Sequence, residues 1–147
     1  MRERGFGTCP SAPQAENLLY SVDLETAERI CCKNRHYAEF RGYAVRKTSW
    51  LEDVSRKGEV TYYDPISFKP LFIAPRGRTF EAFIKESKKS GWPSFRDEEV
   101  VWENVRALKN GETISVDGTH LGHNLPDAKG NRYCINLVCV AGKAPLQ

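Results

Sequence analysis

The 147-residue sequence lacks any long apolar stretch and any strong excess of one charge. Its longest apolar run is about eight residues, whereas a membrane-spanning helix needs roughly 18 to 20. Lys and Arg number 22 against 19 Asp and Glu, which gives a net charge of +3 with the two signs interspersed. We therefore expect a soluble protein with no membrane segment, and the weak charge argues against a nucleic-acid partner. Nothing suggests a large apolar interface, so we expect a monomer.

The sequence also has no Cys-x-x-Cys pair, and its number of cysteines is odd. The first absence excludes a zinc ribbon, and five irregularly spaced cysteines are too few for a disulfide-stapled secreted scaffold. The first residues show no apolar core of a secretory signal. We therefore expect reduced thiols and a cytoplasmic location, with an organellar location left open. The cysteines are Cys9, Cys31, Cys32, Cys134 and Cys139.

Residues 1–20 are rich in Gly, Pro, Ser and other polar side chains without periodicity. This pattern predicts a flexible N-terminal arm, followed by a single domain over residues 21–147. Helical spacing of apolar residues predicts one helix over residues 21–34, with its N-cap at Ser21 or Asp23. A second helix is predicted from Phe80 to Lys89.

The other segments alternate between apolar and polar residues or are rich in β-branched and aromatic residues, which is typical of strands. Turn residues separate them. The sequence therefore predicts a mainly β fold of antiparallel sheets with one or two short helices. The predicted strands cover residues 60–65, 69–75, 94–102, 112–118 and 132–142.

The last of these strands carries a candidate nucleophile. Because side chains of a strand alternate between faces, Cys134 shares its face with Arg132 and Asn136. A nearby guanidinium favours the thiolate, which is the nucleophilic form of cysteine. The alternative is that Cys134 is a small core residue, as most free cysteines are.

Two histidines, His120 and His123, precede this strand. They could bind a metal together if they lay on a helix, but the segment reads as extended. On a regular strand their rings would face opposite ways, so a shared site requires a bulge or bend at Gly122. Histidines that titrate near neutral pH are suited to donate a proton beside a thiolate.

A third feature is the Gly-Trp-Pro-Ser-Phe segment at residues 91–95. Its indole, Trp92, is suited either to pack the core or to form the wall of a pocket for an apolar group such as a methyl-sulfur terminus.

Together, GWPSF (91–95), HLGH (120–123) and RYCIN (132–136) resemble the methionine-R-sulfoxide reductase family in order and separation. The resemblance extends upstream through EFRGY (39–43) and KPLF (69–72). It implies the family's β fold and a thiol-dependent reduction of methionine-R-sulfoxide, free or in proteins, as a repair of oxidative damage. It assigns the nucleophile to Cys134, proton donation to His120 and His123, support of the thiolate to Arg132, hydrogen bonding to Asn136, and substrate binding to Trp92 and Phe95.

The sequence departs from the family at the positions of its structural zinc. Many members bind zinc through two Cys-x-x-Cys pairs, and here those positions hold Asp64, Ser67, Ile114 and Asp117. Isoleucine cannot bind a metal, so we expect no zinc and no cofactor other than an external dithiol such as thioredoxin.

A second departure concerns recycling of the oxidised cysteine. Some relatives place a resolving cysteine where this chain has Ser90. The sequence leaves three alternatives: Cys32 or Cys31 as resolving thiol, then Cys9 on the arm, then direct reduction of the sulfenic acid. Cys31 and Cys32 could equally pack a helix face. On a continuous strand Cys139 would lie about 16 Å from Cys134, too far to form a disulfide with it.

The leading interpretation is therefore a methionine-R-sulfoxide reductase. The alternative is a non-catalytic domain on the same scaffold that binds a ligand or senses oxidants. A nucleic-acid binder built on the Lys and Arg residues between positions 76 and 89 is the third, and solvated helix lysines explain that cluster equally well.

Overall fold

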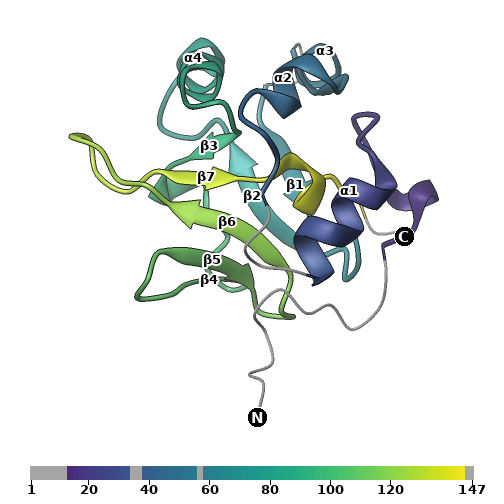
Figure 1. Ribbon diagram of the computed structural model, residues 1–147. Coiled ribbons are helices and arrows are strands. Elements are labelled where there is room, and N and C mark those ends of the chain that lie inside the picture. Colours follow the sequence, from purple (N-terminus) through teal and green to yellow (C-terminus); the bar gives the residue numbers. More distant parts are fainter. Residues whose placement is uncertain (1–12, 34–37, 56–57, 145–147) are drawn as a thin grey trace.

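The computed structural model describes residues 13–33, 38–55 and 58–144. It is mainly β, with two antiparallel sheets and several short helices around them (Figure 1). The larger sheet has the strand order β3-β7-β6-β5-β4, and the smaller one pairs β1 with β2. The predicted fold class is confirmed. The strands are β1 (Val60–Tyr63), β2 (Pro70–Ala74), β3 (Ser94–Phe95), β4 (Val105–Ala107), β5 (Glu112–Ser115), β6 (His120–Asn124) and β7 (Tyr133–Ile135).

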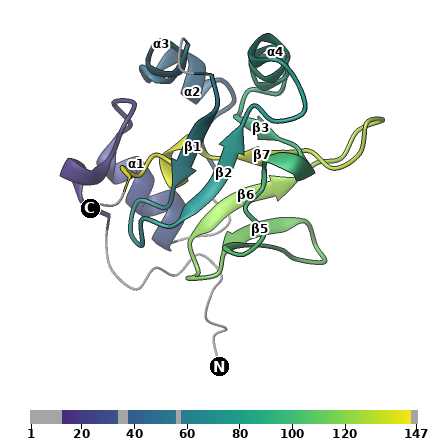
Figure 2. The same ribbon diagram turned by 180° about the vertical axis from the view of Figure 1, so that it is seen from behind.

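An aromatic core joins the small sheet to the large one. Figure 2 shows β1 and β2 in front of the five-stranded sheet. The Phe72 ring of β2 stacks on the Phe95 ring of β3 at 4.3 Å between centroids, and Tyr62 meets Phe95 edge-on at 5.3 Å. Such ring pairs combine a large buried apolar area with favourable quadrupole geometry. This packing leaves the opposite face of the large sheet for the polar residues described below.

The helix α4 (Phe80–Ser90) agrees closely with its prediction. The Thr79 side chain accepts a hydrogen bond from the backbone of Ala82 and caps the N-terminus, and Gly91 ends the helix in the left-handed region. A Cβ atom at Gly91 would come within 2.1 Å of the Arg41 side chain. Glycine is therefore required at the point where α4 leads into the Trp92 segment.

The first predicted helix forms as two consecutive pieces, α1 (Leu24–Glu28) and the π-helical turn η2 (Arg29–Lys33). Of the two candidate N-caps, the structure uses Asp23, whose carboxylate accepts from Thr26 N at 2.9 Å. The alternative cap, Ser21, lies outside the helix.

Two further helices, α2 (Tyr43–Arg46) and α3 (Trp50–Val54), were not predicted. Each is too short for helical periodicity to be visible in the sequence. In α3, Trp50 is fully buried and its indole N–H donates to the Tyr62 hydroxyl at 3.0 Å, so tertiary packing stabilises this helix.

Two predicted strands are much shorter than expected. The segment 94–102 continues beyond β3 as the 3-10 turn η3 (Asp97–Glu99), and the segment 132–142 continues beyond β7 as the 3-10 turn η4 (Leu137–Cys139). After β7, the backbone forms turn hydrogen bonds in place of bonds to a neighbouring strand. Cys139 N, for example, donates to Asn136 O at 3.0 Å. Cys139 therefore does not lie on an extended strand with Cys134.

The described part of the predicted N-terminal arm is attached to the domain. It begins with the 3-10 turn η1 (Ala15–Asn17), and Leu19 N donates to Ala141 O at 2.7 Å. Tyr20 is buried, with its ring 6.2 Å from that of Tyr62. Residues 13–20 therefore form part of the packed domain, because the buried aromatic ring of Tyr20 anchors them there. Residues 1–12 of the predicted arm lie outside the described residues.

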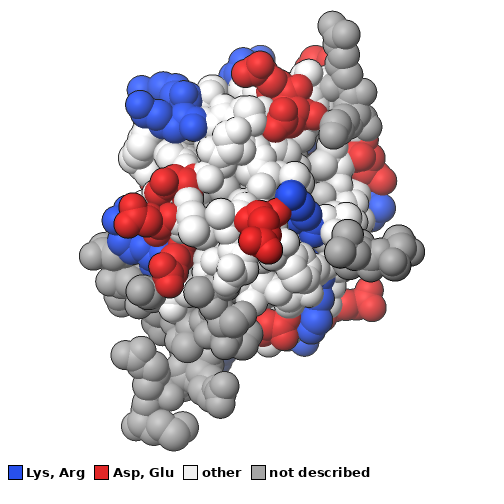
Figure 3. All heavy atoms as spheres, turned by 90° about the vertical axis from the view of Figure 1, so that its right-hand side faces the viewer, with Lys and Arg blue, Asp and Glu red and all other residues white. Residues whose placement is uncertain are grey.

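The described helices include none with the length and apolar character to cross a membrane. Figure 3 shows charges of both signs in small, separate groups on the face that forms the right-hand side of Figure 1. On this face there is no continuous basic field of the kind that phosphate backbones require.

Candidate active site

The outer face of the large sheet carries a row of polar side chains that runs across four strands. In the strand register, Cys134 of β7 lies opposite Ser94 of β3 on one side and His123 of β6 on the other. His123 in turn lies opposite Glu112 of β5. Directly opposed residues of antiparallel strands point to the same face, so these four side chains form one row. The thiol and an imidazole are therefore immediate neighbours.

A bulge in β6 adds His120 to this row. The register shifts between Thr113 and Ile114 of β5, since these residues pair with Gly122 and His120 respectively. The extra residue returns His120 to the face of His123, and the two rings meet at 5.7 Å between centroids. The predicted bend near Gly122 is thus present.

Glycine is required at position 122 by the close approach of β7. A Cβ atom there would lie 2.2 Å from Cys134 O and 2.9 Å from Ile135 Cα. Both are backbone atoms, so a larger residue would push apart the strands that bring Cys134 and His123 together.

The buried His120 ring is oriented by Glu112. Its Nδ1 lies 3.0 Å from Glu112 Oε2, and both side chains are almost fully buried. A carboxylate at this distance favours the proton on Nδ1 and fixes the tautomer of the ring. The side chain of His123, by contrast, is exposed, so that it can exchange protons with solvent.

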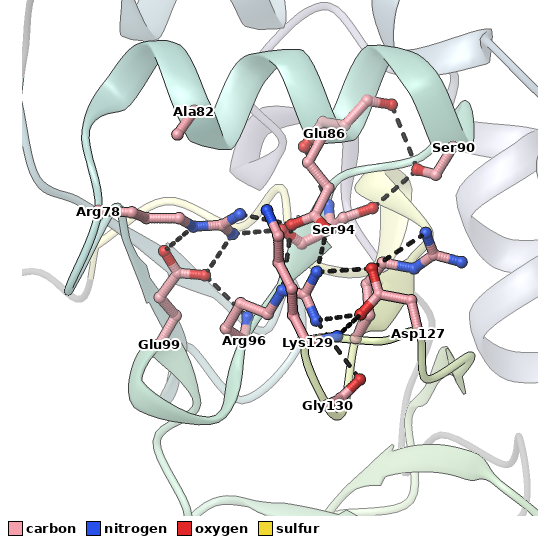
Figure 4. Close-up of polar contacts among 12 residues, drawn as sticks. Arg78, Ala82, Glu86, Ser90, Ser94, Arg96, Glu99, Asp127, Lys129 and Gly130 are labelled. Carbon is pink, nitrogen blue, oxygen red and sulfur yellow. Dashed lines mark hydrogen bonds and ion pairs between the residues drawn. The ribbon is translucent and has the colours of Figure 1, made fainter.

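Cys134 is 7% exposed and is the only free thiol among the described cysteines. Its Sγ lies 3.7 Å from Ser94 Oγ, and Ser94 Oγ lies 2.7 Å from Ser90 Oγ. The hydroxyl groups of Ser94 and Ser90 thus form a chain of contacts that leads from the thiol to the end of α4. Figure 4 shows Ser90 and Ser94 side by side.

Asn136 and Trp92 are both held by the segment around Glu39. Asn136 Oδ1 accepts from Glu39 N at 2.9 Å, and Asn136 Nδ2 donates to Leu121 O at 3.0 Å. The indole Nε1 of Trp92 donates to Glu39 O at 3.1 Å, and the Trp92 side chain is half-buried. Asn136 and Trp92 are therefore linked to one another through a segment that was not predicted to belong to the site.

The two other predicted residues point elsewhere. Phe95 is fully buried among Phe72, Tyr62 and Phe83, so it packs the core beneath the site. Arg132 donates from Nε to Leu125 O at 3.1 Å, toward the β6–β7 turn. No hydrogen bond or ion pair joins Arg132 to Cys134 in the described part of the chain, because the turn carbonyl holds the guanidinium instead.

A network of ion pairs braces that turn against α4 and β3 (Figure 4). Arg96 pairs with both Asp127 and Glu86, and Arg78 pairs with Glu86 and Glu99. Hydrogen bonds from Arg96 hold the pKa of Asp127 well below its usual range. A pocket of about 340 Å³ lies between this network and the tip of the turn.

The cysteine pairing differs from the prediction of reduced thiols. Cys31 of η2 forms a disulfide with Cys139 of η4, across a sequence separation of 108 residues, and Cys32 is also disulfide-bonded. The 3-10 turn at η4 makes this possible, because it removes Cys139 from the line of β7. Cys31 and Cys32 are therefore not free resolving thiols in this form of the protein. The remaining candidate, Cys9, lies outside the described residues.

Of the four positions that the family resemblance assigns to zinc ligands, Asp64 and Ser67 lie between β1 and β2, Ile114 lies in β5, and Asp117 lies between β5 and β6. Two side-chain contacts join these regions directly. Asp64 accepts from Ile66 N at 2.7 Å and Ser67 N at 3.1 Å through Oδ1, and from the Thr119 hydroxyl at 2.9 Å through Oδ2. Asp117 pairs with Lys69 at 3.1 Å. These side chains do not fit a metal ion, because protein donors already occupy the Asp64 carboxylate. The described residues contain no group of three or more potential ligands suited to a metal.

Sequence reasoning missed three residues of the site, Glu112, Ser94 and Glu39. Ser94 was visible within the GWPSF motif, but only the β3–β7 register brings it to the thiol. Glu112 begins the strand β5, whose other residues are Thr113, Ile114 and Ser115, so no local signal marks it as a partner of His120. No local signal distinguishes Glu39.

Comparison with known proteins finds a similar sequence for part of the chain. No protein-family model matches the sequence. The peptide methionine sulfoxide reductase MsrB of Pseudomonas entomophila (strain L48) is 37% identical over 71 residues, and the alignment covers 42% of this chain and 54% of the relative. The chain thus spans about half the length of this curated relative. Over that part, the chain is similar to a methionine sulfoxide reductase.

Proposed function

We propose that this protein is a thiol-dependent reductase of methionine-R-sulfoxide, with Cys134 as the nucleophile. The observation that carries the proposal is the placement of a free thiol directly opposite His123, with His120 brought to the same face by the β6 bulge. The partial similarity to a methionine sulfoxide reductase supports it. We include oxidised proteins and free methionine sulfoxide as candidate substrates.

In the proposed reaction, the Cys134 sulfur attacks the sulfoxide sulfur while the sulfoxide oxygen takes a proton. His123 is the better placed proton donor, because it is exposed and lies opposite Cys134. His120 lies beside it, in the tautomer that Glu112 fixes. The hydroxyl group then passes from the substrate sulfur to the Cys134 sulfur, as the bonds that join the substrate sulfur to oxygen and to Cys134 both break. The substrate leaves as a thioether, and Cys134 carries the oxygen as a sulfenic acid. The half-buried face of Trp92 supplies an apolar wall for the substrate methyl group.

We propose that an external dithiol, such as thioredoxin, reduces the sulfenic acid directly. One thiol attacks the Cys134 sulfur and releases water, and the second displaces Cys134 as a free thiol, leaving the dithiol oxidised to a disulfide. This route is favoured because Cys31 and Cys139 are paired with each other, and Ser90 cannot form a disulfide.

We also propose that the fold needs no zinc, since Asp64–Thr119 and Lys69–Asp117 join the loops that zinc holds in many relatives. We expect purified protein to contain well under one equivalent of zinc by elemental analysis. A chelator is expected to leave its unfolding midpoint unchanged. One equivalent of tightly held zinc would refute the proposal.

The function is tested with separated epimers of a methionine sulfoxide peptide and a small dithiol as reductant. We expect turnover of the R epimer and no measurable turnover of the S epimer. The apolar wall and the proton donor occupy fixed positions around Cys134, so only one configuration at sulfur places both the methyl group and the oxygen correctly. If folded protein with a reduced Cys134 acts on neither epimer, the chain is a binding or sensing domain instead.

A further inference from the structure

The segment that includes Glu39 crosses the outer face of the sheet between the Trp92 motif and the strand of Cys134. Its backbone binds both sides, because Glu39 N donates to Asn136 Oδ1 and Glu39 O accepts from Trp92 Nε1. One residue therefore contacts the apolar wall and the amide of the proposed site. Glu39 itself was not among the predicted site residues.

The Trp92 side of this segment has several independent attachments. Arg41 donates to the carbonyls of Lys89 and Ser90 at 2.7 and 3.1 Å, and Gly42 N donates to Gly91 O at 2.7 Å. These bonds hold the segment to the end of α4 whatever side chain is present at position 39. These bonds do not reach β7, so other contacts must fix the distance between this segment and β7.

The Glu39 carboxyl group provides the link on the β7 side. It is buried, and its Oε2 accepts from Val138 N at 2.7 Å, two residues beyond Asn136 in the turn η4. The second oxygen, Oε1, is buried without a hydrogen-bond partner. A buried carboxyl group with an unsatisfied oxygen lowers stability, so it is expected to serve a purpose other than folding.

We propose that Glu39 is a positioning residue that sets the distance between the Trp92 wall and the strand of Cys134 and Asn136. The inference rests on the proposed reductase function and names a determinant of substrate fit in the same site. Its carboxyl group fixes η4, its backbone fixes Asn136 and Trp92, and the bonds of Arg41 and Gly42 transmit this position to the Trp92 motif. Glu39 does not touch the reacting atoms.

Burial raises the pKa of the Glu39 carboxyl group to about 8, so the group is mostly uncharged at neutral pH. Glutamine has the same length and an uncharged carbonyl oxygen that can accept the Val138 bond. Glu39→Gln is therefore the conservative variant, whereas Glu39→Ala removes the side-chain bond to η4 and keeps only the backbone bond to Asn136.

The test compares the parent chain, Glu39→Gln and Glu39→Ala on the R-sulfoxide peptide with a small dithiol. We expect Glu39→Ala to raise KM about tenfold with little change in kcat, because loss of one buried hydrogen bond loosens the apolar wall but leaves Cys134 and His123 in place. We expect Glu39→Gln to restore the parent KM. Asp23→Ala is the control for general destabilisation, since it removes the cap of α1 and is expected to leave KM unchanged.

A second measurement decides the inference without turnover. Hydrogen exchange of the Trp92 indole N–H, identified by its loss in Trp92→Phe, is expected to be about tenfold faster in Glu39→Ala than in the parent chain or Glu39→Gln. Equal exchange in all three chains, or an equal KM, would overturn the positioning role. If the parent chain acts on neither epimer, the proposed function fails, and the exchange rates alone support or overturn the role of Glu39.

Discussion

Replacing Cys134 with serine is expected to reduce turnover of the R epimer below detection, a loss on the order of a thousandfold or more. A serine hydroxyl is a far weaker nucleophile than a thiol at neutral pH, and it cannot form the sulfenic acid that carries the oxygen. The change is nearly isosteric at a site where Sγ lies 3.7 Å from Ser94 Oγ. We therefore expect the fold to be kept.

The unfolding midpoint and the circular dichroism of Cys134→Ser provide the control for folding. His123→Asn is the matched variant for proton donation, and we expect it to lower kcat by about a hundredfold or more while Cys134 remains reactive toward an alkylating agent. Substantial turnover by Cys134→Ser would show that another thiol carries the reaction. The placement of the site on β7 would then be wrong.

The second large effect is expected on stability. Replacing both Cys31 and Cys139 with serine removes a bond that closes a loop across 108 residues. A cross-link over a loop of this size restricts the unfolded chain by about 4 to 5 kcal/mol, which corresponds to a decrease in the melting temperature of about 10 to 15 °C. Urea unfolding of the parent chain and the double variant, without reductant, measures the difference.

The same variant separates the structural and catalytic uses of these cysteines. With a small dithiol, we expect the folded double variant to turn over the R epimer as fast as the parent chain, since neither sulfur takes part in the proposed chemistry. A loss of turnover at temperatures where the variant is folded would make one of the two cysteines a resolving thiol. A change in stability below about 1 kcal/mol would mean that the bond does not restrict the unfolded chain as the entropic account requires.

Features that depend on neighbouring residues were predictable from the sequence. The helix α4 has its cap at Thr79, its apolar residues at helical spacing and its glycine stop at Gly91, all within about a dozen residues. The strands β1, β2 and β5 were recognisable from alternation and turn residues. The candidate nucleophile and both histidines lay in short motifs, and the family resemblance indicated the four positions at which many members have zinc ligands.

The lengths of the strands could not be predicted, because a local pattern does not show where contacts with distant residues turn the chain. The residues after Ile135 are apolar enough to continue β7, but the chain turns at Asn136 because its amide is bound by Glu39 and Leu121. The sequence therefore predicted a continuous strand on which Cys139 lies too far from Cys134 to form a disulfide with it. The actual turn places Cys139 against Cys31.

The sequence by itself determined which candidate groups lie in recognisable motifs: Cys134, two histidines and the indole of Trp92, on strands and turns that local propensity specifies. Only the tertiary structure decided how they meet. The β6 bulge aligns His120 with His123, the β5 register supplies Glu112, and Glu39 reaches Asn136 across 97 residues of sequence. The physical reason is that propensity and capping act within one or two turns of the chain, whereas register, burial and cross-links depend on segments that become neighbours only when the core has formed.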